Sequence, residues 1–450
     1  MDLKRKALEW LRSVRQEANE LESRAVSLLA GQPQSAGWLP PSIMIAGRDP
    51  HRQVWAQTLT LGSAVPPAVL ALADSRGRSA IGQVKSGLES GTSELVIASE
   101  LGFGYEFFEV KQQSKVSTKS VSRWHRFIGA DWRCELDERG WIRVVMIGKH
   151  ICSPFARLSA WRKGDGWIEE KTASEMTIEE GELLTAARVK LDFGGIPVVR
   201  EVVLFRSIPL VLLRLLFEFD GDEIGIAWED ETKLCLVIEF DGVEDVWHSI
   251  PFGAVSMPAG YGFFSNGWTA LEHREREMGL ALLTRGHPRQ FYRDGRLFCV
   301  LGWGGTRFSL RIPAAWDRMD RFDHKLAGKH LLEFALVPYV GDWRLARIPV
   351  LAQKFLNPAR IALCGSVGNR GRRLFEIDDY TPLMLGLERD QDGSLIALGH
   401  ECAGTTADMD RVFADSLSLE RLIDLADNEL EGIGPFRIFR ARFTPAARDQ

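Results

Sequence analysis

Short apolar segments separated by tight turns run through most of this chain, and this rhythm constrains the fold more than any other feature. Four dipeptides mark such turns: Arg139-Gly140, Gly194-Gly195, Asp294-Gly295 and Asp392-Gly393. Glycine tolerates the positive φ that hairpin turns require, so these dipeptides between alternating segments are typical of β-hairpins. Residues 134–136 and 141–145 flank the first dipeptide as two hairpin strands would. The pattern predicts an all-β body from residue 42 onward.

Two apolar stretches qualify this picture. Residues 200–219 form a long run that is rich in β-branched side chains and contains Pro209, which favours strands packed between two sheets over a helix. Near the end of the chain, Leu419, Leu422 and Ile423 recur at helical spacing. We therefore expect a second helix at residues 418–430.

Residues 3–29 differ from everything after them. Apolar side chains recur there at steps of three and four, placing a continuous seam on one helix face; they are Ala7, Leu11, Val14, Ala18, Leu21, Ala25 and Leu28. Gly31 is a natural end for this helix. Three partners remain open for the seam: the chain's own sheets, a second copy of the helix in a homodimer, or another protein.

Composition excludes some classes of protein. The net charge is −5, with no basic excess to suggest a nucleic-acid partner. The six cysteines lie far apart without metal-ligand spacing, so we expect reduced core residues. The N-terminus lacks the apolar run of a secretory signal, and residues 208–217 are too short to cross a bilayer. We expect a cytoplasmic protein without a membrane partner.

Several phrases, taken in order, resemble the β region of the family 38 α-mannosidase-like glycoside hydrolases. Asp74, Gly77 and Gln83 begin the series. The later phrases are Leu101-Gly102 with Tyr105, Trp228-Glu229, Pro251-Phe252-Gly253, Trp268 with residues 279–283, and residues 294–297, 328–330, 334–339 and 341–343. Each phrase is short, and their shared order over residues 42–405 carries the resemblance.

The resemblance implies a mainly β fold: a multi-sheet β-sandwich, including a galactose-mutarotase-like supersandwich, with one N-terminal α-helix. It divides the chain into an amphipathic helix at residues 1–31, a linker at 32–41, a small β domain at 42–115, and a supersandwich with a C-terminal sheet at 116–450. The helix corresponds to the last helix of the bundle that joins the family's catalytic domain to its sandwiches.

The resemblance also implies what this chain lacks. In the family, an N-terminal domain holds a zinc ion and an aspartate nucleophile, and about 41 residues are too few to form it. A Leu-Leu-Arg phrase brings an arginine toward the family's active site, but here the segment reads Val300-Leu301-Gly302-Trp303. We expect no metal site and no cofactor in this chain; zinc would belong to a separate catalytic chain, if one exists.

Candidate carbohydrate-binding residues are aromatic or lie beside aromatics, because aromatic faces stack on sugar C–H surfaces. They are Tyr261, Trp268, Trp228, Glu229 and Trp303. The simpler alternative is that Tyr261 and Trp268 fill a sheet interface and that Glu229 lies in a solvated turn. A glycan is the ligand that these residues favour.

Candidate catalytic residues are weaker. His273, Glu272, His330 and Tyr292 offer the acid and base types that a lyase, epimerase or glycosidase needs. The alternative is a structural role for each, and the sequence does not show whether they converge. Three functions therefore stay open: a glycan-binding protein or accessory subunit of a two-chain glycoside hydrolase, an autonomous carbohydrate-active enzyme, and a structural scaffold that dimerises through the helix at residues 3–29.

Overall fold

The computed structural model describes Gln16 and Glu20 and residues 42–47, 55–61, 65–74, 78–99, 103–121, 125–152, 154–172, 175–226, 229–258, 260–309, 320–364, 372–377, 383–389, 394–406, 412–414 and 417–445. Mainly β structure is confirmed. The predicted helix at residues 3–29 lies outside the described residues except for Gln16 and Glu20, which are helical and joined by a side-chain hydrogen bond of 2.8 Å.

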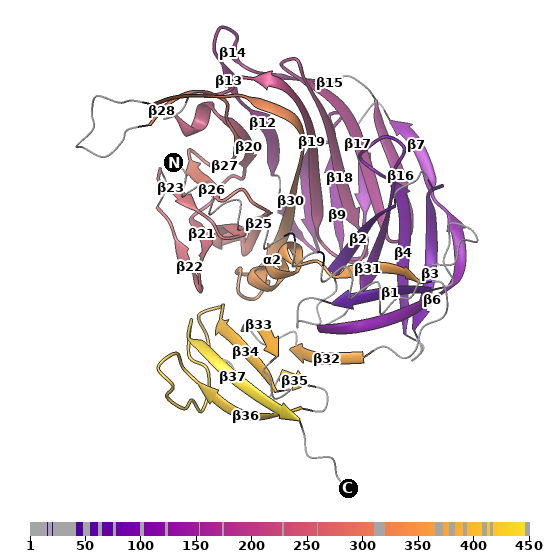
Figure 1. Cartoon of the computed structure of the whole chain (residues 1–450). Helices are drawn as coiled ribbons and strands as arrows, with labels where there is room; N and C mark the ends of the chain where they lie inside the picture. The colour runs from indigo at the N-terminus through magenta and orange to yellow at the C-terminus, as the bar shows by residue number, and fades with distance from the viewer. Residues whose placement is uncertain are drawn as a thin grey trace, which may run out of the picture.

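A nine-stranded sheet forms the first body, on the right of Figure 1. In spatial order its strands are β2 (Trp55–Leu61), β5 (Ser93–Ser99), β4 (Ser79–Ser86), β3 (Ala68–Asp74), β6 (Phe103–Lys115), β1 (Ser42–Gly47) and β31 (Arg360–Cys364), with β32 (Arg372–Ile377) and β35 (Val412–Ala414) extending from β6. Alternate residues such as Ile43, Ile45 and Leu95 fill its own core. Gln57 of β2 accepts a hydrogen bond from Ala359, just before β31, so the two end strands lie close together.

An eleven-stranded sheet is the centre of the molecule. Its order is β22 (Gly253–Ser256), β21 (Asp245–Ile250), β24 (Trp268–His273), β25 (Met278–Thr284), β30 (Leu326–Val340), β19 (Val211–Asp222), β18 (Ile196–Phe205), β17 (Leu184–Phe193), β16 (Met176–Glu180) and β7 (Ser117–Val121), with β15 (Glu170–Thr172) also on β17. The strands predicted in residues 200–219 are confirmed as β18 and β19. Successive residues alternate between two cores, Val202 and Leu204 on one face and Val203 and Phe205 on the other. Burial on both faces explains the uninterrupted apolar sequence.

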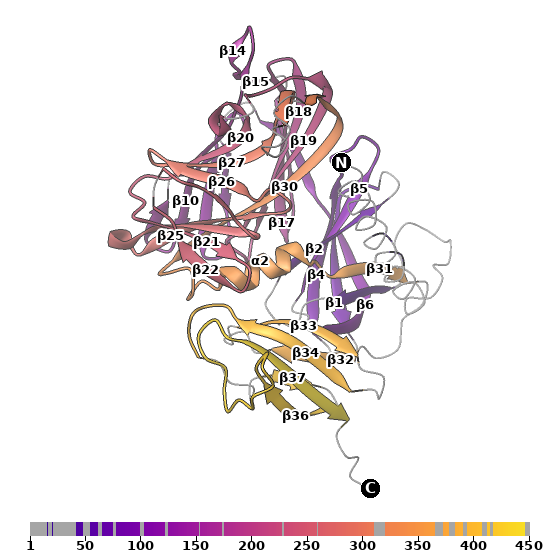
Figure 2. The same ribbon diagram turned by 60° about the vertical axis from the view of Figure 1, so that its left-hand side comes forward.

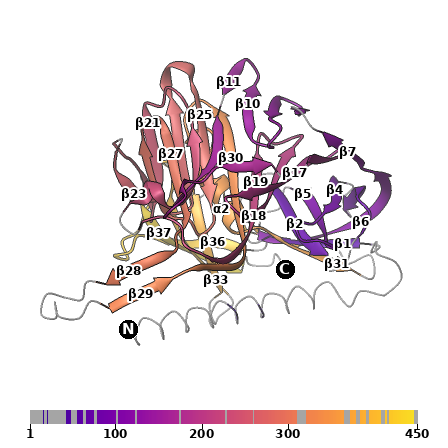
Figure 3. The ribbon, with the colours of Figure 1, turned by 90° about the horizontal axis from the view of Figure 1, so that it is seen from above.

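Two smaller sheets cover one face of this sheet and complete a sandwich. One contains β11 (His150–Cys152), β10 (Ile142–Ile147), β9 (Trp132–Leu136) and β8 (His125–Ile128); the other contains β12 (Phe155–Ser159), β20 (Leu234–Glu239), β27 (Arg296–Gly302), β26 (Arg289–Arg293) and β23 (Gly262–Phe264). The predicted hairpin at Arg139-Gly140 is confirmed as β9 and β10. Two hairpins project, β13 (Trp161–Arg162) with β14 (Gly166–Trp167), and β28 (Gly305–Ser309) with β29 (Asp320–His324); Figure 3 shows the second from above.

The C-terminal sheet contains β33 (Leu383–Arg389), β34 (Leu395–Glu401), β37 (Ile438–Pro445) and β36 (Leu417–Ile423). The helix expected at residues 418–430 is wrong, because this segment is β36 followed by a turn. An α-helix does precede β31: α2 (Ile348–Leu356) lies where the eleven-stranded, nine-stranded and C-terminal sheets approach one another (Figure 2). The short 3₁₀ helices η1 (Asp230–Thr232) and η2 (Arg274–Arg276) complete the described elements.

The described cysteines agree with a reduced protein. Five of them are free and buried: Cys134, Cys235, Cys299, Cys364 and Cys402. Within the described ranges, no helix has the length and apolar character needed to cross a membrane.

Candidate functional site

Glu272, the first candidate acid or base, is a structural anchor. It lies near the end of β24 with 8% of its surface exposed, and it accepts hydrogen bonds from the Tyr339 hydroxyl (3.2 Å) and the Trp343 backbone N–H (2.8 Å). Burial raises the pKa of Glu272, and it also raises the pKa of Tyr339. The carboxylate thereby holds the segment that leads from β30 to α2.

His273 and Tyr292 flank one turn without meeting. The His273 ring lies so close to Gly242 that a side chain there would clash with it, and the buried Nδ1 makes no hydrogen bond. Tyr292 lies in the sandwich core, where burial and then Asp241 raise the pKa of its hydroxyl. No hydrogen bond joins the two side chains.

His330 is separate again. It lies on β30, where its Nε2 is 2.8 Å from the Ala327 carbonyl oxygen and its ring meets Phe219 edge-on. On β19 its register partner is Phe217, while Glu272 and His273 pair with Gly279 and Met278 on β25. His330 is therefore separated along the sheet from Glu272 and His273, and no hydrogen bond joins any two of the four candidate side chains.

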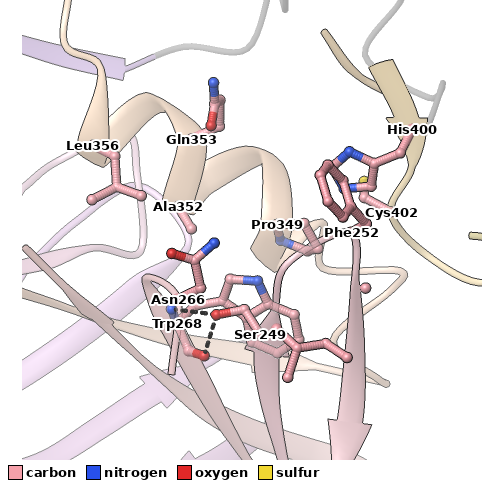
Figure 4. A pocket seen from close by; sticks show the side chains of 12 residues that line it. Ser249, Phe252, Asn266, Trp268, Pro349, Ala352, Gln353, Leu356, His400 and Cys402 are labelled. Carbon is pink, nitrogen blue, oxygen red and sulfur yellow. Dashed lines mark hydrogen bonds between the residues drawn. The ribbon is translucent and has the colours of Figure 1, made fainter. Parts of the chain in front are cut away.

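Trp268 is a core residue. Only 4% of it is exposed, and its ring centroid lies 5.0 Å from that of Trp343. Figure 4 shows Trp268 beneath α2, with the Ser249 side chain hydrogen-bonded to its backbone. Trp268 also lines a cavity of about 100 Å³. Small-molecule sites usually occupy about 300–1,000 Å³, so this crevice between α2, Phe252 and His400 is too small for a sugar unit.

A better candidate is a row of side chains at the edge of the five-stranded sheet, which we call the Asp230 surface: Asp230, Lys233, Phe264, Arg289 and Trp303. At its centre, the Asp230 carboxylate binds two cations. Arg289 donates from Nε to Oδ2 at 2.8 Å, and Lys233 donates from Nζ to Oδ1 at 2.6 Å. Burial alone would raise the pKa of Asp230, but hydrogen bonds from Lys233 and Arg289 lower it.

An aromatic ring flanks each cation. The Arg289 guanidinium carbon lies 5.3 Å from the centroid of Phe264, and Lys233 Nζ lies 5.9 Å from that of Trp303. Phe264 is 66% exposed, an unusual state for a phenylalanine. The row therefore alternates apolar faces with hydrogen-bond donors that are already held in place.

Local structure fixes this geometry. Phe264 on the edge strand β23 is the register partner of Arg289 on β26, so the two side chains are cross-strand neighbours. Asp230 begins η1, and Thr232 closes that turn by donating to the Glu229 carbonyl at 2.7 Å. β23, β26 and η1 thus position Phe264, Arg289 and Asp230, while Lys233 directly follows η1 and Trp303 directly follows β27.

Three predicted carbohydrate-binding residues lie at or beside this surface. Trp303 belongs to it, Glu229 directly precedes Asp230, and Tyr261, 65% exposed, directly precedes β23. Trp228 lies outside the described residues. Arg289 and Lys233 were missed, because a lone cation in a sequence does not reveal which carboxylate it will bind.

A second charged cluster, the ion network, lies between the nine-stranded and eleven-stranded sheets. Its members are Lys85, Glu94, Arg188, Glu201 and Arg214. Lys85 Nζ binds Glu201 (2.8 Å) and Glu94 (2.8 Å), while Arg214 binds both carboxylates at 2.9 and 2.7 Å. The carboxylates are fully paired and almost wholly buried, which suits a joint between sheets better than ligand binding.

The described residues form no metal-binding site. No group of three or more His, Cys, Asp or Glu side chains is arranged there to hold an ion.

Two solved structures have a fold similar to that of this chain. The chain is similar to an α-mannosidase from Enterococcus faecalis V583, with a TM-score of 0.61 and 9% identity over 90% of this chain and 56% of that one. It is also similar to a protein in glycosyl hydrolase family 38 from Enterococcus faecalis, with a TM-score of 0.62 and 10% identity over 94% and 60% of the two chains. This chain shares their fold.

The likeness confirms the resemblance at the level of fold. The chain spans less than two thirds of the length of either protein. No known family model matches the sequence, and no curated protein does.

Proposed function

We propose that this chain binds a glycan on the Asp230 surface and serves as a non-catalytic part of a carbohydrate-active enzyme, beside a separate catalytic chain. The observation that carries this proposal is the alternation of Phe264, Arg289, Asp230, Lys233 and Trp303 across one end of the five-stranded sheet, with Phe264 exposed. Any zinc would be held by the catalytic partner.

The chemistry of the row favours sugars. Aromatic faces stack on the C–H surfaces of pyranose rings, and prepositioned charged side chains bind hydroxyls at defined places. Arg289 and Lys233 retain donors beyond those that Asp230 uses, since a guanidinium has five and an ammonium three. One carboxylate between two cations leaves the row without a strong charge, which suits a neutral or weakly acidic glycan.

Two further observations support the accessory role. Glu272 and His273 on β24, Tyr292 on β26 and His330 on β30 have structural environments, and no hydrogen bond joins any two of these side chains, which leaves the autonomous enzyme without an assembled acid/base pair among the described residues. The two similar structures are an α-mannosidase and a family 38 protein. The predicted helix at residues 3–29 offers an apolar seam for the catalytic partner or for a second copy of this chain.

Binding can be tested with a glycan array, followed by calorimetric titration of the best ligand. Phe264→Ala and Trp303→Ala should each weaken binding by about tenfold, because each removes a stacking face worth about 1 kcal/mol or more. Trp167→Ala is the matched control, since this tryptophan is 56% exposed but lies on the β13–β14 hairpin.

Two results would contradict the proposal. Unchanged affinity in both ring variants would remove the Asp230 surface from glycan binding. Robust turnover of an aryl α-mannoside by the purified chain alone, with zinc or cobalt supplied, would refute the non-catalytic role.

A further inference from the structure

A second hollow lies between the nine-stranded and eleven-stranded sheets, beside the end of α2. We call it the Leu331 cavity. Its volume is about 280 Å³, close to the lower end of the range usual for small-molecule sites. Side chains of β2, β19, β30 and α2 line it, together with Arg285, which directly follows β25. Junctions between domains are frequent ligand sites.

The apolar part of the lining is only partly covered. Trp55 and Phe355 are almost wholly buried, and their rings meet edge-on with centroids 6.4 Å apart, so this part is already filled. Leu331 on β30 also lines the cavity, but 45% of it is exposed. Covering an exposed leucine with hydrocarbon releases free energy. Leu331 therefore favours a ligand with a hydrocarbon face.

The wall formed by β2 supplies hydroxyl groups. Thr58 and Thr60 are two residues apart on one strand, so their side chains lie on the same face, and both line the cavity. Both are exposed, and neither side chain hydrogen-bonds to another described residue. A hydroxyl can donate and accept, so the pair suits a ligand that carries hydroxyls of its own.

A cation lies at the opposite wall. Arg285 donates from Nη1 to Glu333 Oε2 at 2.7 Å and from Nη2 to the Phe355 carbonyl oxygen. The two terminal nitrogens of a guanidinium carry four N–H groups, so two of them remain for a ligand. The Nε–H is enclosed and takes no part. The side chain lines the cavity with 38% of its surface exposed.

The charge of this wall favours an anion. Arg214 Nε donates to Glu333 Oε1 at 3.2 Å, so the ion network continues to Arg285. With Glu333 and Arg285 added, the network has four cations and three carboxylates, a formal charge of +1. The next register pair on this face, Lys329 with Glu218, adds no net charge.

The surplus positive charge lies at the cavity. Arg285 binds only Glu333, which it shares with Arg214, whereas the other cations of the network all bind Glu201. Arg285 is also the most exposed of these cations, at 38% against 2–22% for the others. Arginine pairs well with a carboxylate, because its N–H groups match the two oxygens.

We propose that the Leu331 cavity binds a small hydroxylated carboxylate, such as a sugar acid. The carboxylate lies on Arg285, the hydrocarbon face on Leu331, and hydroxyls toward Thr58 and Thr60. This site goes beyond the proposed function, because it lies at the joint between two other sheets and needs no residue of the Asp230 surface.

Calorimetric titration of the full chain with glucuronate and with glucose tests the site, since the two probes differ by one carboxylate. Glucuronate should bind saturably, and glucose at least about tenfold more weakly, because hydrogen bonds to a charged group are the stronger ones. Leu331→Trp, which fills the cavity, and Arg285→Met should each weaken glucuronate binding by at least about tenfold. Thr60→Val should weaken it by about two- to tenfold, the effect of one hydrogen bond.

Matched variants separate this site from the rest of the molecule. Leu398→Trp places the same large side chain at another half-exposed leucine, on β34, and should leave binding unchanged. Arg296→Met should also leave it unchanged, because this arginine is 46% exposed and pairs with Glu239 on a different sheet.

Three results would overturn the inference. They are no saturable binding of glucuronate, glucose binding as tightly as glucuronate, and wild-type affinity in Leu331→Trp and Arg285→Met that are folded as judged by an unaltered Tm. If Arg285→Met lowers the Tm, the affinity of Leu331→Trp decides alone.

Discussion

Two buried glutamates on the central sheet have opposite pKa shifts. For Glu201, burial alone would raise the pKa, but Lys85, Arg214 and Arg188 hold it far below its ordinary range. For Glu272, burial raises the pKa, and hydrogen bonds from Trp343 and Tyr339 only partly offset this. Folding therefore makes the Glu201 carboxyl easier to ionise and the Glu272 carboxyl harder to ionise than in the unfolded chain.

Replacing each carboxylate by its amide should expose this difference. Glu201→Gln leaves buried cations without their counter-charge and should lower the free energy of unfolding by about 3–5 kcal/mol. Glu272→Gln keeps an acceptor for Trp343 and removes a poorly solvated charge, so stability at neutral pH should change by less than about 1 kcal/mol, toward stabilisation. Urea denaturation of both variants and the wild type provides the measurement.

The pH dependence supplies an internal check. The unfolded Glu201 carboxyl takes up its proton near its ordinary value of 4.5, whereas the folded one remains ionised well below that. The stability that ionised Glu201 contributes is complete above its ordinary pKa and declines as the pH falls below that value. The difference in free energy of unfolding between wild type and Glu201→Gln should therefore become smaller in acid. If this difference grew in acid, or if Glu201→Gln and Glu272→Gln lowered the free energy of unfolding equally, the opposite pKa shifts would be contradicted.

At the scale of elements, Glu401 organises the end of β34. Its fully buried carboxylate accepts backbone N–H bonds from Ala403 (2.7 Å), Gly404 (2.7 Å) and Phe436 (2.9 Å). These donors come from two segments, and Gly404 and Phe436 both have positive φ. One side chain therefore holds two irregular turns together.

Glu401→Ala should loosen both turns while leaving the strands paired. Hydrogen bonds to a charged group contribute about 1.5–3 kcal/mol, so amide exchange at Ala403, Gly404 and Phe436 should accelerate by about tenfold or more. Exchange at Ile97, in the core of the nine-stranded sheet, serves as the control. Unaltered protection of Phe436 would show that other contacts fix its turn.

The same sheet shows where local sequence patterns fail. Leu419, Leu422 and Ile423 have helical spacing, yet they pair with β37 as β36. The turn that ends the segment is held by Asp424, which accepts N–H bonds from Ala426 and Asn428. Pairing with a strand some 20 residues away outweighed the local pattern, whereas the hairpin at Arg139-Gly140 was predictable because its partner is adjacent.

The candidate site was predictable to a similar degree. Exposed aromatics near Tyr261 and the acids after Trp228 could be singled out in the sequence, and the Asp230 surface contains or adjoins them. Its centre could not be predicted, because Asp230 and Arg289 are 59 residues apart and meet through the sheet order β20–β27–β26, in which η1 precedes β20. Burial of Trp268 was the simpler alternative in the sequence, but its cover by α2 was not predicted.

At the scale of the whole molecule, Arg344 links the central body to the C-terminal sheet. Its guanidinium carbon lies 4.3 and 5.0 Å from the ring centroids of Trp343 and Trp247, and its Nε donates to the Ala403 carbonyl at 2.8 Å. Phe436 packs beside Gly253 of β22 at the same boundary. The sheet is thus attached by a few specific contacts.

Arg344→Ala should weaken this attachment. Loss of one cation–π pair and one hydrogen bond amounts to about 1–3 kcal/mol, so thermolysin should release the C-terminal sheet about tenfold faster, with little change in the core. Arg421→Ala, at an exposed arginine of β36 paired only loosely with Glu429, is the matched control. Equal cleavage rates in the two variants would argue that Arg344 does not secure the sheet.

The nine-stranded sheet joins strands from distant parts of the chain, and this affects how the protein is made. β1 pairs with the nearby β6 and also with β31. Ile43 therefore cannot pair with Leu363 until about 320 further residues have been synthesised. During synthesis at about 5–20 residues per second, one edge of β1 therefore stays open for some tens of seconds after it leaves the ribosome. An open edge can pair with a neighbouring chain, so the nascent protein passes through a period of exposure to aggregation, in which a chaperone would improve its yield.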